Sequence, residues 1–264
     1  MKLELSIALL QADLFWENPD ANRASFEEMI WQVPKGTDLI ILPEMFTTGF
    51  SMQVEQHAEV ANTNTLKWMQ QQAAQTGAVL MGSVMTKAQG NFYNRMYVVY
   101  PDGSFKTYDK RHLFGLAGED KDYTAGTERV VVEVQGWKVF PLICYDLRFP
   151  VWARSQHTDA QLYEYDLLVY VANWPAPRVN AWDTLLAARA IENISYCVGV
   201  NRVGEDGVGA SYVGHSAVYD YKGAQLTFSD KAEIMTAKLY AEELKTFRER
   251  FPFQADADQF RLLD

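Results

Sequence analysis

Three residues that could carry out chemistry follow apolar runs that are typical of buried β-strands. Cys144 directly follows the run 139–143, Glu44 follows the run 39–43, and Lys110 lies just beyond a predicted hairpin strand. Taken alone, each has a simpler interpretation: an isolated cysteine usually packs in a core, and a lone glutamate or lysine usually lies in solvent. Ligand sites in α/β sheets gather at the carboxyl ends of strands, so we expect the three side chains to meet there.

Together, the three side chains are the parts of a thiol hydrolase. The glutamate can take the proton of the thiol and return it to a leaving amine. An ammonium beside the thiol favours the thiolate and balances the oxyanion. The thiolate attacks an amide carbonyl to give a thioester, which water then cleaves, and backbone N–H groups after Cys144 are free to bind the oxyanion. We expect such an activated thiol to react rapidly with iodoacetamide near neutral pH.

The other reactive groups of the sequence predict no further chemistry. Cys197 lies in the middle of the apolar run 196–200 and is expected to be a small buried side chain. No G-x-S-x-G elbow or Walker loop occurs. None of the four histidines lies three or four residues from another and no Cys-x-x-Cys is present, so we expect neither a metal nor a cofactor.

Strand-like and helix-like segments alternate along the chain, which predicts an α/β layered sandwich. The turn at 101–104 predicts a hairpin, and residues 220–223 are predicted to form another turn. Helices are expected over 21–32, 65–75, 150–156 and 180–193, the second closed by Gly77 and the third opened by Pro150. Strands are expected over residues 3–10, 38–42, 78–84, 95–100, 130–134, 138–143, 166–171, 196–200, 216–219 and 234–239, with another beginning at Phe105.

The composition indicates a folded protein and disfavours several kinds of partner. The chain of 264 residues is 48% hydrophobic and has a net charge of −10. This apolar content excludes a mainly disordered chain, and the acidic field disfavours nucleic acids and anionic membranes. No apolar run spans a bilayer and the N-terminus lacks the features of a secretion signal, so we expect a cytoplasmic protein. Without a linker or repeat, residues 1–264 are predicted to form one domain, with 247–264 as a C-terminal tail.

Three blocks of the sequence resemble the signature blocks of the nitrilase (carbon–nitrogen hydrolase) superfamily. They are residues 42–46, 108–113 and 143–150, and their order of glutamate, lysine and cysteine also matches. The segments 171–174 and 187–193 extend the likeness, which runs from residue 3 to about 239. The resemblance implies a four-layer αββα sandwich that is usually assembled as a dimer, with helices packed on helices.

The resemblance also implies roles for individual residues. It makes Glu44 the general base, Lys110 the oxyanion stabiliser and Cys144 the nucleophile. A second glutamate is expected between the lysine block and a glycine; Glu119 is the best match, beside Asp120, and would act as a positioning or auxiliary acid–base group.

The segments 44–51 and 173–178 are similar to the ω-amidase branch of the superfamily, whose members deamidate short 2-oxo acid ω-amides such as 2-oxoglutaramate and 2-oxosuccinamate. A small anionic substrate needs a local positive group, and Arg148 is the candidate; alternatively, it is a structural arginine that bridges carboxylates. Phe46, Tyr145 and Trp174 are the other expected substrate-binding residues.

Two other readings of the function stay open at this stage. The same scaffold also suits hydrolysis of nitriles, N-carbamoyl compounds or aliphatic amides, and a catalytically inactive binding protein is a remote alternative. For the assembly we expect a homodimer formed through the helices at 150–156 and 180–193. The tail would reach over the neighbour and cover its own apolar residues, which are Phe251, Phe253, Phe260, Leu262 and Leu263.

Overall fold

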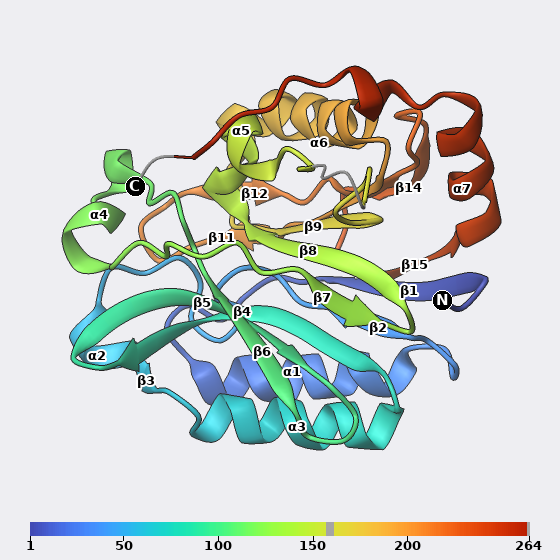
Figure 1. The fold of residues 1–264 in the computed structure, drawn as a ribbon. Coiled ribbons are helices and arrows are strands. Elements are labelled where there is room, and N and C mark those ends of the chain that lie inside the picture. Colours follow the sequence, from blue (N-terminus) through green and yellow to red (C-terminus); the bar gives the residue numbers. More distant parts are fainter. Residues whose placement is uncertain (157–160, 263–264) are drawn as a thin grey trace.

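Two β-sheets stacked face to face form the centre of the protein, and helices cover the outer face of each sheet (Figure 1). This computed structural model describes residues 1–156 and 161–262. The expected four-layer αββα sandwich is therefore confirmed. Its layers place the carboxyl ends of strands from both sheets at one side of the molecule.

The first sheet has a parallel centre with antiparallel flanks. Strands β1, β2 and β4 are parallel to one another, whereas β15, β5 and β6 pair antiparallel. Two antiparallel pairings separate β6 from β4, so β6 ends at the same edge as β4 and β2. The order across the sheet is β15 (Glu233–Tyr240), β1 (Glu4–Gln11), β2 (Leu39–Ile41), β4 (Val79–Ala88), β5 (Asn91–Val99) and β6 (Phe105–Asp109), with β3 (Glu59–Val60) also paired to β4.

The second sheet repeats this plan. Strands β8, β9 and β10 are parallel, and the outer strands pair antiparallel. A separate hairpin joins β11 (Val203–Glu205) to β12 (Ser211–Val213). The order across the sheet is β14 (Gln225–Ser229), β13 (Ser216–Tyr219), β10 (Tyr196–Val200), β9 (Leu167–Val171), β8 (Trp137–Ile143) and β7 (Val132–Val134).

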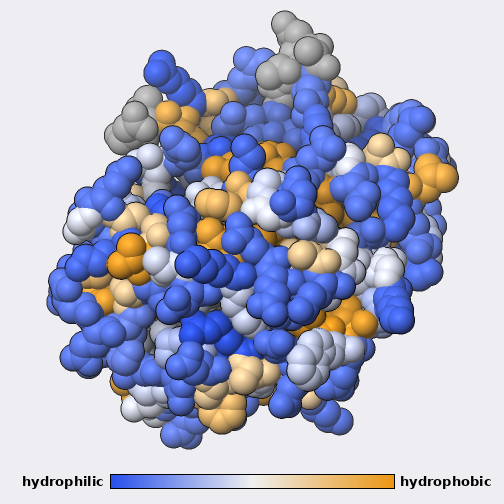
Figure 2. All heavy atoms as spheres, turned by 90° about the horizontal axis from the view of Figure 1, so that it is seen from below, coloured by the Kyte–Doolittle hydropathy of each residue, from blue (hydrophilic) through white to orange (hydrophobic). Residues whose placement is uncertain are grey.

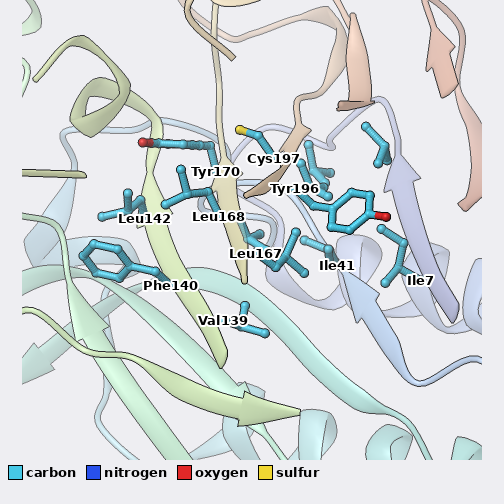
Figure 3. Close-up of a cluster of buried hydrophobic side chains, with 14 of the residues drawn as sticks. Ile7, Ile41, Val139, Phe140, Leu142, Leu167, Leu168, Tyr170, Tyr196 and Cys197 are labelled. Atoms are coloured by element: carbon cyan, nitrogen blue, oxygen red, sulfur yellow. The ribbon is translucent and has the colours of Figure 1, made fainter. Parts of the chain in front are cut away.

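The alternation of side chains along β1 explains how the sheet is buried on both faces. Leu5, Ile7 and Leu9 belong to the core between the two sheets, while Ala8 and Leu10 face the helices of the first layer. Figure 3 shows part of the inter-sheet core, where side chains of β1 and β2 lie near those of β8, β9 and β10. Strands buried on both faces read as continuous apolar runs in the sequence, which is why most of them were predicted.

The helices of the first layer begin and end within two residues of their predicted bounds. The side chain of Asn18 caps α1 (Pro19–Gln32) by accepting a hydrogen bond from the Ala21 N–H at 3.2 Å. Helix α3 (Asn64–Thr76) ends at Gly77, whose φ of 70° is the left-handed conformation that glycine adopts without strain. Seen from below, the outer face of this layer is largely hydrophilic (Figure 2).

The second layer consists of α5 (Pro150–Ala153) and α6 (Val179–Asn193). An apolar row on α6, formed by Trp182, Leu186 and Ala190, is buried against the second sheet. Shorter helical turns lie in the connections: α2 (Val54–His57), α4 (Glu119–Asp122), η1 (Gly115–Ala117), η2 (Cys144–Arg148), η3 (Ala176–Arg178) and η4 (Phe253–Asp256).

The C-terminal region differs from its prediction. Helix α7 (Ala241–Arg250) was not predicted, and the expected tail boundary at 247 falls inside it. Past α7, the chain docks on its own domain, where the buried Gln254 side chain donates a hydrogen bond to the Ser155 carbonyl at 2.6 Å. Phe253 and Phe260 are exposed, and Leu263 lies outside the described residues. The hairpin β11–β12 and strand β14 were also missed, and the helix expected to reach residue 156 ends at Ala153.

Within residues 1–156 and 161–262, none of the helices has the length and apolar character needed to cross a membrane.

Candidate active site

The structure brings Glu44, Lys110 and Cys144 together at the edge where strands of the two sheets end. Glu44 lies in the turn after β2, Lys110 directly follows β6, and Cys144 opens the turn η2 after β8. Glu119, in the first turn of α4, completes the group and is buried, whereas the adjacent Asp120 is exposed. The three side chains thus lie together at the carboxyl ends of strands, as expected from the sequence.

The ammonium of Lys110 lies between two carboxylates in a fully buried cluster. It donates hydrogen bonds to Glu44 Oε1 at 2.9 Å and to Glu119 Oε2 and Oε1 at 2.9 and 3.0 Å. The side chains of Lys110, Glu44 and Glu119 are 0% exposed. With two carboxylates and one ammonium, the cluster carries one net negative charge while Cys144 is a neutral thiol.

Burial and these charges decide the protonation states. Burial opposes the charge of Lys110, but Glu119 and Glu44 outweigh it and hold the pKa of the ammonium above its ordinary value. Burial raises the pKa of Glu119, and Lys110 counteracts this rise. Desolvation raises the pKa of the Cys144 thiol well above its ordinary value; the charge of Glu44 adds to the rise, and Lys110 only partly offsets it.

The expected effect of the ammonium, which favours the thiolate of Cys144, is therefore opposed by burial and by the charge of Glu44. A thiolate would add a second net negative charge to a buried cluster, which low-dielectric surroundings disfavour. These surroundings favour the thiol of Cys144, whose proton then moves to a base as the sulfur attacks.

Two asparagines hold the carboxylate of Glu44 in place. Asn94, on β5, donates to Glu44 Oε1 at 2.7 Å, and the backbone N–H of Asn173 donates to Glu44 Oε2 at 2.7 Å. The Asn173 side chain also donates to the Glu44 carbonyl at 2.6 Å. Sequence reasoning missed Asn94 and assigned Asn173 no role; Asn94 lies in the polar half of β5, beside Arg95, so nothing in the local sequence marked it.

Cys144 has a strained backbone of the kind that projects a nucleophile. Its φ is 42°, in the left-handed region that is uncommon for residues other than glycine, and it is the first residue of η2. Because a helical turn starts there, its first N–H groups have no partner within the turn and can bind an oxyanion. Cys197, in contrast, is 0% exposed in the middle of β10, as predicted.

A cavity of about 560 Å³ opens onto Lys110 and Cys144. Tyr145, Trp174 and Arg148 line it, as expected of substrate-binding residues. Sequence reasoning missed several other lining residues, among them Phe50, Phe114, Arg178 and Tyr212.

Phe46 does not line the cavity, which corrects the prediction for this residue. It is 0% exposed and packs against Phe26 and Trp68 of the first helical layer, at ring centroid distances of 5.6 and 5.8 Å. The turn after β2, in which Met45 has a φ of 43°, directs Phe46 back into the core. Phe50, four residues later, takes the place at the cavity.

Two arginines of the cavity wall rest on aromatic rings. The guanidinium of Arg148 lies 4.9 Å from the ring centroid of Trp174, and that of Arg178 lies 5.1 Å from the centroid of Phe114. Among the residues that the structure describes, neither guanidinium has a carboxylate or hydrogen-bond partner. The bridging of carboxylates that was the alternative role of Arg148 is thus not seen in the described part of the chain.

No group of three or more histidine, cysteine, aspartate or glutamate side chains arranged to hold a metal ion occurs in the described ranges 1–156 and 161–262.

The match of residues 6–249 to the carbon–nitrogen hydrolase family shows that the chain belongs to that family. The predicted resemblance to the nitrilase superfamily is confirmed. More particularly, the chain is 45% identical to the omega-amidase YafV of Yersinia enterocolitica, over 98% of this chain and 99% of that protein. It is 33% identical to the 2-oxoglutaramate amidase of Bacillus subtilis, over 95% of this chain and 96% of that protein.

A solved structure of similar sequence shares the fold. This CN-hydrolase superfamily protein from Xanthomonas campestris, solved with an arsenic adduct in its active site, has a TM-score of 0.96 and 41% identity. The match covers 99% of this chain and 100% of that chain.

Proposed function

We propose that the protein is an ω-amidase that hydrolyses small 2-oxo acid ω-amides, such as 2-oxoglutaramate and 2-oxosuccinamate, to the 2-oxo dicarboxylate and ammonia. The observation that carries the proposal is the buried Glu44–Lys110–Glu119 cluster beside Cys144, in a chain similar over nearly its full length to enzymes named for this activity.

Acylation begins with the substrate amide carbonyl above Cys144. Glu44 takes the thiol proton while the sulfur attacks the carbonyl carbon, so no standing thiolate is needed. The ammonium of Lys110 and the first N–H groups of η2 bind the resulting oxyanion. Glu44 then gives the proton to the departing nitrogen, the C–N bond breaks, and ammonia leaves a thioester on Cys144.

Deacylation uses the same groups in the second half of the cycle. Glu44 takes a proton from water, the hydroxyl oxygen attacks the thioester carbonyl, and the oxyanion returns to Lys110. The C–S bond breaks, the acid product leaves, and the sulfur regains its proton from Glu44. Glu119 holds the ammonium of Lys110 and keeps it charged through both steps, as a positioning group.

The cavity arginines supply the preference for an anionic substrate. The net charge of −10 repels an anion at long range, so binding has to come from oriented groups close to the substrate. Arg148 presents a planar fork that matches a carboxylate with two hydrogen bonds, and Arg178 adds a second positive charge to the same wall. Trp174 and Tyr145 limit the length of the substrate.

Ammonia release over a panel of substrates tests the proposal. The panel contains 2-oxoglutaramate, 2-oxosuccinamate, a neutral short amide, a nitrile and an N-carbamoyl compound. The highest kcat/KM is expected for the two anionic amides. A highest value for the nitrile or the N-carbamoyl compound would overturn the proposal and assign the chain to one of those reactions.

Substitution of Arg148 with lysine tests the source of the preference. Because lysine lacks the fork, the variant should lose one charge-assisted hydrogen bond, worth about 1.5–3 kcal/mol, and KM for 2-oxoglutaramate should rise roughly 10–100-fold. KM for the neutral amide should change little. Arg250→Lys is a matched control, because Arg250 also rests on a ring, that of Phe251 at 5.1 Å, but does not line the cavity. An equal rise in KM for both substrates would show that Arg148 does not bind the substrate carboxylate.

We also propose that residues 1–264 act as a single hydrolase domain, assembled as a homodimer in the cytoplasm. Val151 on α5 and Ile191 on α6 are each 53% exposed, and a second copy packed on this layer would cover them. Both cysteines are free thiols, which suits a reducing compartment. Light scattering should give twice the mass of the 30.1 kDa chain; a single 30.1 kDa species would contradict the dimer.

A further inference from the structure

We propose that Asp146 is a positioning residue that sets the distance between the oxyanion-binding ammonium of Lys110 and the sulfur of Cys144. The inference rests on the proposed function only in that both residues act in amide hydrolysis. Asp146 does not line the cavity, so its effect has to pass through the residues that it holds.

The carboxylate of Asp146 is a buried acceptor of four hydrogen bonds. Its Oδ1 accepts from the backbone N–H of His112 at 3.0 Å and contacts His112 Nδ1 at 2.8 Å. Its Oδ2 accepts from the hydroxyl of Tyr108 at 2.7 Å and from the backbone N–H of Ile143 at 3.0 Å. Asp146 is 0% exposed, so water does not replace a bond that is lost.

These donors come from the two segments that carry the reacting groups. Tyr108 and His112 lie two residues before and two residues after Lys110, at the end of β6 in the first sheet. Ile143 directly precedes Cys144, at the end of β8 in the second sheet. One carboxylate therefore joins the lysine-bearing segment to the nucleophile-bearing turn across the interface between the sheets.

Further contacts restrict both sides of this junction. The ring of His112 stacks on Phe149 at a centroid distance of 3.8 Å. The hydroxyl of Tyr108 accepts a hydrogen bond from the indole of Trp152, on α5, at 3.0 Å. Burial and the charge of Asp146 raise the pKa of Tyr108 well above its ordinary value, so Tyr108 stays a donor.

The bond to Ile143 also supports the strained turn of the nucleophile. Cys144 keeps a φ of 42°, and such a conformation persists only where surrounding contacts hold it. Loss of the Asp146 carboxylate should let the turn relax and move the sulfur relative to the ammonium. A displacement of about 1 Å at a reacting centre can cost about 10²-fold in rate.

The substitution Asp146→Asn tests the inference, because it keeps the shape of the side chain and turns one acceptor atom into a donor. We expect kcat to fall by about 10–100-fold, with a smaller change in KM because Arg178, the other cavity arginine, lies outside the turn η2. Asp166→Asn is the matched control. Asp166 is also buried and accepts from the Lys138 N–H at 3.0 Å and from Arg248 at 2.7 Å, but it does not touch the site. It should lower Tm and leave kcat unchanged.

A double-mutant cycle separates positioning from stability. If Asp146 acts through Lys110, then Asp146→Asn should cost much less kcat in a Lys110→Met background than in the wild type. The inference would be overturned if Asp146→Asn lowered kcat by the same factor in the Lys110→Met background as in the wild type. It would also be overturned if Asp146→Asn lowered Tm but left kcat, measured per titratable thiol, unchanged.

Two further measures cover a variant that does not fold and a wrong substrate assignment. If Asp146→Asn does not fold, Tyr108→Phe removes one of the four bonds and carries the same comparison of kcat, KM and coupling to Lys110. The assay uses whichever amide the wild type turns over fastest, so a wrong substrate assignment would appear in the wild type and leave the positioning result readable.

Discussion

Replacement of Lys110 with methionine removes the buried ammonium while keeping an unbranched side chain of similar length. The oxyanion then loses its cation, and we expect kcat to fall by about 10²–10³-fold, as for loss of one donor in other oxyanion holes. Glu44 also loses the hydrogen bond at 2.9 Å that helps to orient its carboxylate, so acylation and deacylation should both slow. Ammonia release under saturating substrate measures the loss.

The same substitution should destabilise the fold, because it leaves Glu44 and Glu119 buried without their cation. Breaking a buried ion pair by removing one partner costs about 3–5 kcal/mol, which for a chain of this length lowers Tm by roughly 10 °C. Thermal unfolding followed by circular dichroism measures the shift.

The destabilisation should depend on pH with a definite sign. Burial already raises the pKa of Glu119, and Lys110 is the group that counteracts the rise, so its loss raises that pKa further. A group whose folded pKa lies above its unfolded pKa contributes stability at low pH, which is lost as the pH rises through the folded pKa. The gap in Tm between Lys110→Met and the wild type should therefore be smaller at about pH 5 than at about pH 8.

A second, half-buried cation supplies the control. Arg248 pairs with Asp166 at 2.7 Å, far along the chain from the cluster, and Arg248→Met should lower Tm while kcat per folded molecule stays unchanged. The reasoning would be refuted if Lys110→Met kept kcat within about threefold of the wild type, well short of the expected loss. If the gap in Tm between Lys110→Met and the wild type did not change with pH, only the explanation by the pKa of Glu119 would be refuted.

The other predictions concern the two thiols and the base. Cys144→Ser should abolish turnover with the fold intact, whereas Cys197→Ser should keep kcat and lose about 1–3 kcal/mol of stability through a buried hydroxyl; the reverse pattern would disprove the assignment. Because the pKa of Cys144 is raised, its alkylation by iodoacetamide should still be accelerating above neutral pH, and a plateau near pH 7 would contradict a protonated thiol. Glu44→Gln should slow hydrolysis by about 10²–10⁴-fold, with both ammonia release and thioester hydrolysis affected. Incubation of the wild type with a chelator should leave ammonia release unchanged; activity lost to the chelator and restored by zinc would refute the mechanism.

The cavity wall shows where sequence reasoning stopped. Trp174, Tyr145 and Arg148 were expected there and lie there, because they follow strand ends or the nucleophile itself. Phe46 was expected there and is buried in the core, because the direction of a side chain in a turn depends on the φ of the turn residues. Arg178 lies at the cavity because η3 returns the chain toward Phe114, and no local pattern encodes that contact.

The sequence by itself determined the class of fold and predicted which side chains meet at the candidate active site. Apolar runs bounded by turn residues specify strands locally, and polar residues at their carboxyl ends meet at one edge in any such sheet. Glu44, Lys110 and Cys144 could therefore be named before any coordinates, and Gly77 and Pro150 marked helix boundaries by their own backbone preferences.

The tertiary structure alone decided the contacts and charges that surround these groups. The hydrogen bonds that hold Glu44 join residues separated by 50 and 129 positions in the chain, and the junction at Asp146 joins segments of different sheets. The protonation of Cys144 is the sum of desolvation and of charges that only folding brings together. For that reason the sequence suggested only that the ammonium favours the thiolate, whereas in the folded protein burial and the charge of Glu44 oppose it.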